Sequence, residues 1–400
     1  MTPEKLRIAF ATPEFVTEHH FDGGLANYLN RVSKKLADLG HDVHVVTLSL
    51  DDEAEFDYEG VMVHRVMLRP AWHAVNRLTR YSLATTLHWL NFSAQAYRKL
   101  KQLHRREPLH VIQYPNYSSC GLFSIPLLRV IHVVRASSQP GWNHLAGARR
   151  SLDTTLTECL EALQYRLTRN VHAPSRAIQN ILTTRASTRN ARLIRSPFFV
   201  ETRDWDSAVY DRFLANRKYV LYFGRFQVHK GVDTLAHALP HFLHQCPDAY
   251  AALVGRDMET SLASSMAGLV RAQSNSSGDR LVILGSLPHS QLYPIISGAH
   301  LVVLPYVMDN LPNACLEAMG LGKVVIGTGG TSFEELIKDG VNGFLAPPDN
   351  PQALAEKMIA AWTDQRLGAM SVAAKRQMLE FAPETAIASL VGYYSEVLSA

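Results

Sequence analysis

The sequence predicts an α/β protein made of two doubly wound domains that face each other across an interdomain cleft. Its 400 residues suit two domains, since domains commonly hold about 100–200 residues. Short apolar runs alternate with helical patterns along the chain, which is typical of βαβ units and parallel sheets. The runs are almost continuously apolar, as expected for strands that helices cover on both faces.

The first half is expected to form one domain over residues 1–200. We expect its strands at Leu6–Ala11, Asp42–Leu48, Val61–Val66, His110–Tyr114, His132–Ala136, Val171–Ala173 and Arg192–Ile194. The second half, residues 201–382, repeats the pattern. We expect its strands at Tyr219–Gly224, Tyr250–Gly255, Leu281–Gly285, Leu301–Tyr306, Val324–Thr328 and Gly343–Ala346. Ligands of such folds bind beyond the carboxyl ends of the strands.

The segment between the halves, residues 197–217, lacks a clean period, and we place the hinge there. Beyond residue 350 the pattern is helical, with helices expected at Pro351–Trp362, Gln365–Phe381 and Pro383–Leu398. Pro383 suits the first turn of a helix. We expect the C-terminal helix, residues 383–400, to pack back on the first domain.

Composition excludes several classes of protein. Hydrophobic residues make up 47% of the chain and charged residues 19%, which indicates a globular protein with a sizeable core. No apolar run reaches the roughly 18–20 residues that span a bilayer, and no signal-peptide pattern is visible. The four cysteines lie far apart and form no C-x-x-C pair, so we expect a cytoplasmic protein without a structural metal.

Charge is unevenly distributed. Residues 60–200 hold 20 Lys and Arg against 4 Asp and Glu, a net charge of +16. Much of it is arginine interleaved with aromatic residues between Trp72 and Arg106, and no recognised nucleic-acid-binding module accompanies it. An apolar stripe at helical spacing (Leu83, Leu87, Leu90, Ala94 and Tyr97) predicts an amphipathic helix with this stripe in the core. A second, functional interpretation keeps this stripe in the core and adds that the outer face of the helix contacts an anionic acceptor, a lipid-linked sugar or a membrane surface.

Three loops that follow strands carry residues suited to chemistry. The first, Phe21–Leu25, has a double glycine that lets the backbone approach a phosphate or sugar closely, although it could equally be a tight turn. It lacks the G-x-G-x-x-G dinucleotide fingerprint. The second, Gly224–Gly231, holds two cations, Arg225 and Lys230, between glycines at a helix start, a pattern that suits a diphosphate.

The third loop, Asp309–Gly320, begins with a carboxylate after a strand and has a second one, Glu317, eight residues later. A helix is expected to start near Pro312. The backbone N–H groups of Asn313 and Ala314 then lie in its first turn, where an anion could bind them.

In order and spacing, these loops resemble those of the family 4 retaining glycosyltransferases, which have the GT-B fold of two Rossmann-like domains. The resemblance covers nearly the whole chain. The matching segments are FDGGLANYLNRVSKKLADLGHDVHVVT, YFGRFQVHKGVDTL and DNLPNACLEAMGLGKVVIGTGGTSFEELIKDGVNGFLAPPDN.

The resemblance implies that the second domain binds a nucleotide-sugar donor and the first an acceptor. By this resemblance, Arg225 and Lys230 bind the donor diphosphate, Asp309 binds hydroxyls of the donor sugar, and Glu317 binds the ribose. The other donor-binding residues that we assign are Gly24, Gly224, Leu287 (in a segment that touches the base), Asn313 and Ala314. On the acceptor side we assign Asp22, Gly23, Arg135 and Ser137.

Two positions depart from the family's pattern. The first acid is Asp309 rather than the usual glutamate, and Ser137 stands where many members carry histidine. Both positions bear on the identity of the donor sugar.

The resemblance implies a retaining, hexosyltransferase-type enzyme of glycan biosynthesis, and we expect it to need neither cofactor nor metal. Fixed cations at the leaving diphosphate would stabilise charge where it develops. Two alternatives remain: a non-catalytic nucleotide-sugar-binding protein and a sugar-nucleotide epimerase on the same architecture. The expected partners are a nucleotide sugar and a sugar, lipid-linked or other hydroxyl acceptor, with peripheral membrane contact through the basic first domain.

Overall fold

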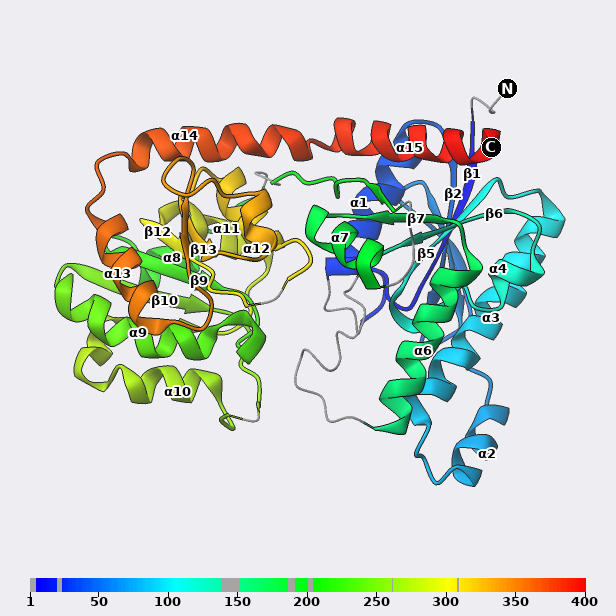
Figure 1. The fold of residues 1–400 in the computed structure, drawn as a ribbon, viewed down its shortest axis with the longest axis horizontal. Coiled ribbons are helices and arrows are strands. Elements are labelled where there is room, and N and C mark those ends of the chain that lie inside the picture. Colours follow the sequence, from blue (N-terminus) through cyan, green and yellow to red (C-terminus); the bar gives the residue numbers. More distant parts are fainter. Residues whose placement is uncertain are drawn as a thin grey trace. The chain divides into compact units, whose positions relative to one another are not determined.

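The computed structural model describes residues 5–19, 24–137, 151–185, 191–200, 204–260, 262–307 and 309–400. The chain divides into two compact units, each with its own sheet (Figure 1). The first unit consists of Met1–Pro197 and Pro383–Ala400, and the second of Phe198–Ala382. The expected hinge segment, 197–217, contains the short helix α8 (Ala208–Phe213) and belongs to the second unit from Phe198 onward.

The sheet of the first unit has eight strands in the order β3-β4-β2-β1-β5-β6-β7-β8. They are β1 (Arg7–Thr12), β2 (Asp42–Leu48), β3 (Glu55–Tyr58), β4 (Val61–Val66), β5 (Val111–Pro115), β6 (Ile131–Arg135), β7 (Asn170–Ala173) and β8 (Arg192–Leu193). All neighbours pair in parallel except β3, which pairs antiparallel with β4. Strand β3 was not predicted; it lies at the edge of the sheet, and exposed residues alternate along it.

Helices cover both faces of this sheet. They are α1 (Gly24–Asp38), α2 (Ala71–Leu78), α3 (Ala84–Arg106), the 3-10 turn η1 (Tyr117–Ser119), α4 (Ser124–Leu127), α6 (Leu152–Leu167), α7 (Arg176–Arg185) and α15 (Pro383–Ser399). Side chains of a strand alternate between its faces. Thus Ile8 and Phe10 of β1 share a core with α1 and α15, whereas Ala9 and Ala11 share one with α3 and α6.

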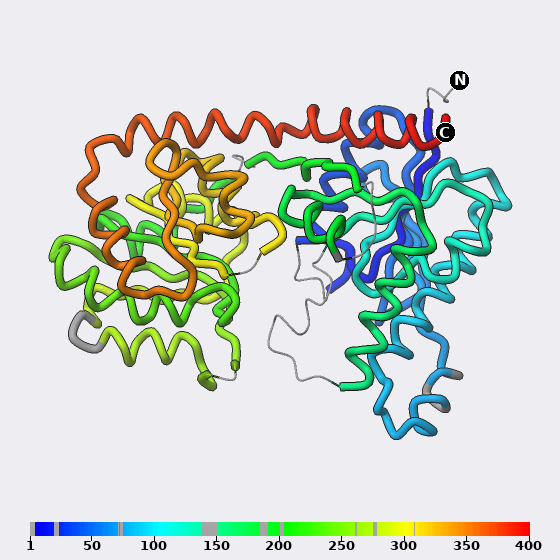
Figure 2. Tube along the Cα trace, viewed as in Figure 1, coloured from blue at the N-terminus to red at the C-terminus, as the bar shows by residue number. Residues whose placement is uncertain are grey.

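The C-terminal helix α15 completes the first unit. In Figure 2 its red trace returns beside the blue N-terminal strands. Its inner face buries Ile387 and Leu390 in the core that it shares with α1. The hydroxyl of Tyr394, fully buried, donates a hydrogen bond of 2.7 Å to Gln113 Oε1 on β5. The helix therefore belongs to the core of a domain whose strands all lie much earlier in the chain, the last of them at Arg192–Leu193.

The second unit has a six-stranded parallel sheet in the order β11-β10-β9-β12-β13-β14. Its strands are β9 (Lys218–Phe223), β10 (Ala249–Val254), β11 (Leu281–Leu284), β12 (Leu301–Val303), β13 (Val325–Thr328) and β14 (Phe344–Ala346). Its main helices are α9 (Val232–Gln245), α10 (Met266–Gln273), α11 (His289–Gly298), α12 (Asn313–Gly320), α13 (Pro351–Trp362) and α14 (Leu367–Gln377). The prediction of two doubly wound α/β domains is therefore confirmed.

The predicted apolar stripe of α3 was largely wrong. Of its five residues only Leu87 is buried, and a neighbouring stripe of the helix supplies the other buried residues. The buried positions farther along the helix are Phe92, Ala96, Leu100 and Leu103. The outer face remains basic, with Arg98, Arg105 and Arg106 exposed.

A buried histidine pair links β2 and β4 in the first unit. His44 Nδ1 and His64 Nε2 lie 3.0 Å apart, and the two rings stack. Burial, assisted by the charges of His44 and Lys99, lowers the pKa of His64 to about 4. An unfolded histidine titrates near 6.5.

We predict that the stability of the first unit falls as the pH drops from about 6.5 to 4. In that window His64 of the unfolded chain binds a proton, whereas folded His64 stays neutral. The free energy of unfolding is therefore at its full value above pH 6.5 and is lower by up to about 3 kcal/mol below the folded pKa. Hydrogen exchange of the β2 and β4 amides at pH 7.5 and 4.5 measures the loss. A His64→Gln variant should reduce this pH dependence, and the buried His44 and His172 of the same unit, whose pKa values burial also lowers, account for the remainder. A control variant at the exposed His237 should leave it unchanged, and an equal slope in His64→Gln and the wild type would contradict the assignment.

Candidate active site

The site is built where the sheet of the second unit reverses direction. Strands β9 and β12 are neighbours, and the chain runs from β9 outward to β10 and β11 on one side and from β12 to β13 and β14 on the other. Open α/β sheets bind ligands at such a switch point, beyond the carboxyl ends of the strands. The predicted loops Gly224–Gly231 and Asp309–Gly320 follow β9 and β12, so the topology brings them together.

Glycine allows the two loops to touch. Gly231 has a φ of 64°, and a Cβ on it would lie 1.9 Å from the carbonyl oxygen of Pro305. Only glycine tolerates both the conformation and the contact. The backbone N–H of Val307 donates to the carbonyl of His229 over 3.1 Å, which ties the loop after β12 to the loop after β9.

The central contact of the site is an ion pair between the two loops. Lys230 Nζ donates to Asp309 Oδ2 over 2.5 Å, and both side chains are more than four-fifths buried. The same ammonium lies 4.2 Å from the ring centroid of Tyr306, whose hydroxyl donates to the carbonyl of Phe223. Ser332 Oγ donates to the backbone carbonyl of Asp309 over 2.8 Å. Two of the predicted residues are thus held together by a fixed frame.

Arg225 stands beside this frame with its side chain exposed. Its backbone is fixed, since the hydroxyl of Tyr222 donates to its carbonyl over 2.9 Å. Burial, together with the charges of Lys230 and Arg225, lowers the pKa of His229 to about 4. His229 is therefore neutral at physiological pH, in a positively charged environment.

Helix α12 begins at Asn313, as predicted, so the N–H groups of Asn313 and Ala314 lie in its first turn. Glu317, one turn later, is only 8% exposed, and its Oε1 lies 3.6 Å from Nε2 of His289. His289 opens α11, two residues after Leu287, and its ring stacks on Tyr293. The sequence did not reveal His289, because one histidine at a helix start has no spacing pattern.

The predicted residues of the first unit are placed by its own sheet. Gly24 is the first residue of α1 and is exposed, while Asp22 and Gly23 lie outside the described residues. Arg135 ends β6 and is 8% exposed, with its guanidinium 3.7 Å from the ring centroid of Tyr28. It donates to the hydroxyls of Ser137 (2.8 Å) and Ser196 (3.0 Å), so it is a buried cation that orients loop serines.

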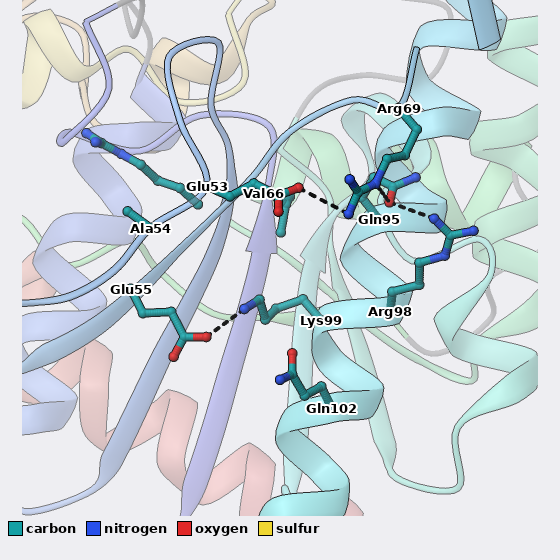
Figure 3. A pocket seen from close by; sticks show the side chains of 10 residues that line it. Glu53, Ala54, Glu55, Val66, Arg69, Gln95, Arg98, Lys99 and Gln102 are labelled. Carbon is teal, nitrogen blue, oxygen red and sulfur yellow. Dashed lines mark hydrogen bonds and ion pairs between the residues drawn. The ribbon is translucent and has the colours of Figure 1, made fainter. Parts of the chain in front are cut away.

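A charged cavity of about 270 Å³ lies between β3, β4 and α3 in the first unit (Figure 3). Lys99 points across it to Glu55 of β3, and Arg98 donates to Gln95 of the same helix. Arg69 pairs with Glu53 at 3.4 Å. Its cations are therefore largely engaged by neighbouring carboxylates and amides, which suits a structural role for this cavity.

Within the described ranges, no three His, Cys, Asp or Glu side chains are grouped as a metal site would require. Nor does any helix there have both the length and the apolar character needed to cross a membrane.

Two doubly wound domains, of which the second carries a basic loop and a helix N-terminus at its switch point, define the architecture of a GT-B glycosyltransferase. Residues 22–202 match the family model described as Glycosyltransferase Family 4, and residues 217–364 match the model described as Glycosyl transferases group 1. The chain belongs to the family 4 glycosyltransferases, and its activity is the transfer of a sugar from a donor.

Known proteins resemble this chain over most of its length. An uncharacterized glycosyltransferase of Methanocaldococcus jannaschii is 23% identical, covering 89% of this chain and 90% of that protein. Sucrose-phosphate synthase from Thermosynechococcus elongatus has a similar structure, with a TM-score of 0.77 at 18% identity over 99% of this chain and 100% of that one. HepE from Anabaena, in complex with UDP-glucose, gives a TM-score of 0.70 at 20% identity over 98% and 99%.

Proposed function

We propose that this chain is a retaining, metal-independent hexosyltransferase that moves a sugar from a nucleotide-sugar donor to a hydroxyl acceptor. The observation that carries the proposal is the Lys230–Asp309 pair at the switch point, beside Arg225 and the first turn of α12. HepE, which shares the fold, has been solved with UDP-glucose.

The reaction breaks the bond between the anomeric carbon and the donor phosphate oxygen. Negative charge then builds on the leaving diphosphate, and fixed positive groups stabilise it where it develops. Lys230, Arg225 and the N–H groups at the start of α12 supply those groups in this chain. The new bond forms from the acceptor oxygen to the same carbon on the same face, and the acceptor proton passes to the leaving phosphate oxygen.

The ion pair gives each partner a second role. Before the donor binds, Asp309 compensates the charge of Lys230, which would otherwise be buried without a partner. When the diphosphate enters, Lys230 exchanges a carboxylate for a phosphate, and Asp309 becomes available to a hydroxyl of the donor sugar. Glu317, held near His289, accepts hydrogen bonds from the ribose.

Thermal unfolding with a panel of UDP-, GDP-, ADP- and dTDP-sugars tests donor binding. A ligand that binds only the folded state raises the melting temperature, by an amount set by its concentration relative to Kd. We expect one nucleotide class to raise it clearly more than the others. No stabilisation by any of them at millimolar concentration would contradict the proposal.

The two alternatives differ from the proposal in one observable. A nucleotide-sugar sensor binds donor without releasing nucleotide, and an epimerase changes the sugar while the nucleotide stays attached. A transferase releases nucleoside diphosphate in an acceptor-dependent way. The paired cation and helix N-terminus at the leaving group favour the transferase.

The outer face of α3 supports a second, separate proposal: peripheral contact with an anionic membrane. Arg98, Arg105 and Arg106 are exposed together on this face. Each basic residue near an anionic bilayer gains about 1 kcal/mol, and salt screens the attraction within about 8–10 Å.

We predict that the protein sediments with anionic vesicles more than with neutral ones and that binding falls steeply with salt. An Arg105→Glu/Arg106→Glu variant should lose binding, and Arg271→Glu in the second unit should not; equal sedimentation with both vesicle types would reject the membrane contact.

A further inference from the structure

The first unit has a switch point of its own, between β1 and β5. The chain leaves β1 toward β2 and β4 on one side and crosses to β5 and β6 on the other. Ligands of doubly wound sheets bind at this position. The turn η1, Tyr117–Ser119, directly follows β5 there and packs between α3 and α6.

The backbone of this turn is strained and firmly held. Ser118 and Ser119 have φ angles of 64° and 49°, which side-chain-bearing residues rarely adopt. Helix α6 fixes the turn: fully buried Gln164 accepts from the N–H of Gly121 over 2.7 Å and donates to the carbonyl of Pro115 over 2.9 Å. Glu161, one turn earlier, accepts from the N–H of Ser118. Strain held in this way is typical of functional sites.

The result of this geometry is an exposed aromatic surface. Tyr117 keeps 40% of its surface accessible. Its ring meets Trp89 of α3 edge-on at 5.5 Å between centroids, and Trp89 meets His88 in the same way at 4.5 Å. Burial of part of the ring, together with the negative charge of Glu14, raises the pKa of Tyr117 to about 12, so its hydroxyl stays a hydrogen-bond donor. Glu14 lies in the loop after β1, across the switch point.

Aromatic rings beside carboxyl groups match the surface of a neutral sugar. A pyranose ring has an apolar C–H face, which packs on the negative face of an aromatic ring, and a rim of hydroxyls, which donate to carboxyl oxygens. A phosphate or carboxylate ligand would instead need accessible cations here, whereas Arg135 at the end of the neighbouring β6 is only 8% exposed, with its guanidinium on the ring of Tyr28.

The cations of α3 lie at the other end of the sheet. Trp89 is in the first half of α3, near the carboxyl ends of the strands, as its contact with Tyr117 shows. Arg105 and Arg106 close the helix, and the chain then enters the amino end of β5 at Val111. The basic face is therefore remote from this switch point.

We propose that Tyr117, backed by Trp89 and with Glu14 across the switch point, binds a neutral sugar ring of a glycan acceptor. The inference rests on the proposed function, in which the first unit binds the acceptor. It names the class of acceptor that this surface takes.

Saturation-transfer NMR on the full chain tests the proposal with defined probes: the methyl glycosides of glucose, galactose, mannose and N-acetylglucosamine, with glucuronic acid and glucose 1-phosphate as anionic counterparts. We expect at least one neutral glycoside to receive saturation at its ring C–H protons. Tyr117→Ala should reduce this signal at least fivefold, and Tyr117→Phe should keep more than half of it. The control Tyr81→Ala removes an exposed tyrosine elsewhere in the same unit, after α2, and should leave the signal unchanged.

An unchanged signal in Tyr117→Ala, no signal from any neutral glycoside in the wild type, or a signal from the anionic probes alone would overturn the proposal. Donor-induced thermal stabilisation, measured on the same samples, separates this outcome from failure of the proposed function. It reports on the second unit, so Tyr117→Ala should retain it, and its retention also shows that the variant is folded.

Discussion

Arg225→Ala and Lys230→Ala should each slow sugar transfer about 10- to 150-fold. A hydrogen bond to a charged group contributes roughly 1.5–3 kcal/mol, and each 1.36 kcal/mol lost from transition-state stabilisation is tenfold in rate. Arg225 is exposed, so its variant should fold normally. Turnover at saturating donor, followed as release of nucleoside diphosphate, measures the effect.

The matched control is Arg271→Ala, which removes an exposed arginine of the same unit on α10. It should keep the wild-type rate. If Arg225→Ala or Lys230→Ala retained more than half of the wild-type turnover, the assignment of these cations to the leaving group would be wrong.

Glu317→Ala and Asp309→Ala should separate nucleotide binding from sugar binding. Glu317→Ala should weaken the nucleoside diphosphate and the intact donor alike, by about 10- to 150-fold in Kd. Asp309→Ala should weaken only the intact donor. It should leave the nucleoside diphosphate as tight or tighter, because Lys230 loses the carboxylate that competes with the phosphate.

Calorimetric titration of both ligands against both variants measures the division. Asp339→Ala, an exposed carboxylate of the same unit, serves as the control. Equal losses for the two ligands in Asp309→Ala would reject the separate role of Asp309.

The strands could be predicted because those of a doubly wound sheet are covered on both faces and read as apolar runs. Most lie within one residue of the expected ends. Strand β12 ends at Val303 instead of Tyr306, since Pro305 has no N–H to continue the ladder. Strand β3 escaped prediction because it is an edge strand with Glu55 and Asp57 exposed. Its four residues alternate between charged and aromatic side chains, and so short a pattern cannot be distinguished from that of a loop.

The candidate site was predictable only as separate loops. The spacing within Gly224–Gly231 and Asp309–Gly320 gave the chemistry of each, but Lys230 and Asp309 are 79 positions apart. Nothing in either loop indicates that they pair. The pairing follows from the strand order, which places β9 beside β12. The same holds for Glu317 and His289, which belong to helices α12 and α11.

Transfer with and without acceptor tests the central claim most directly. A labelled nucleotide sugar is incubated with the enzyme in a chelating buffer, alone and with a glycan acceptor; released nucleoside diphosphate is quantified, and the anomeric configuration of the product is read by NMR. The account predicts release that depends on the acceptor, persists with chelator, and yields a product with the configuration of the donor. Release at the same rate without acceptor, a product of inverted configuration, or loss of activity on chelation would contradict it.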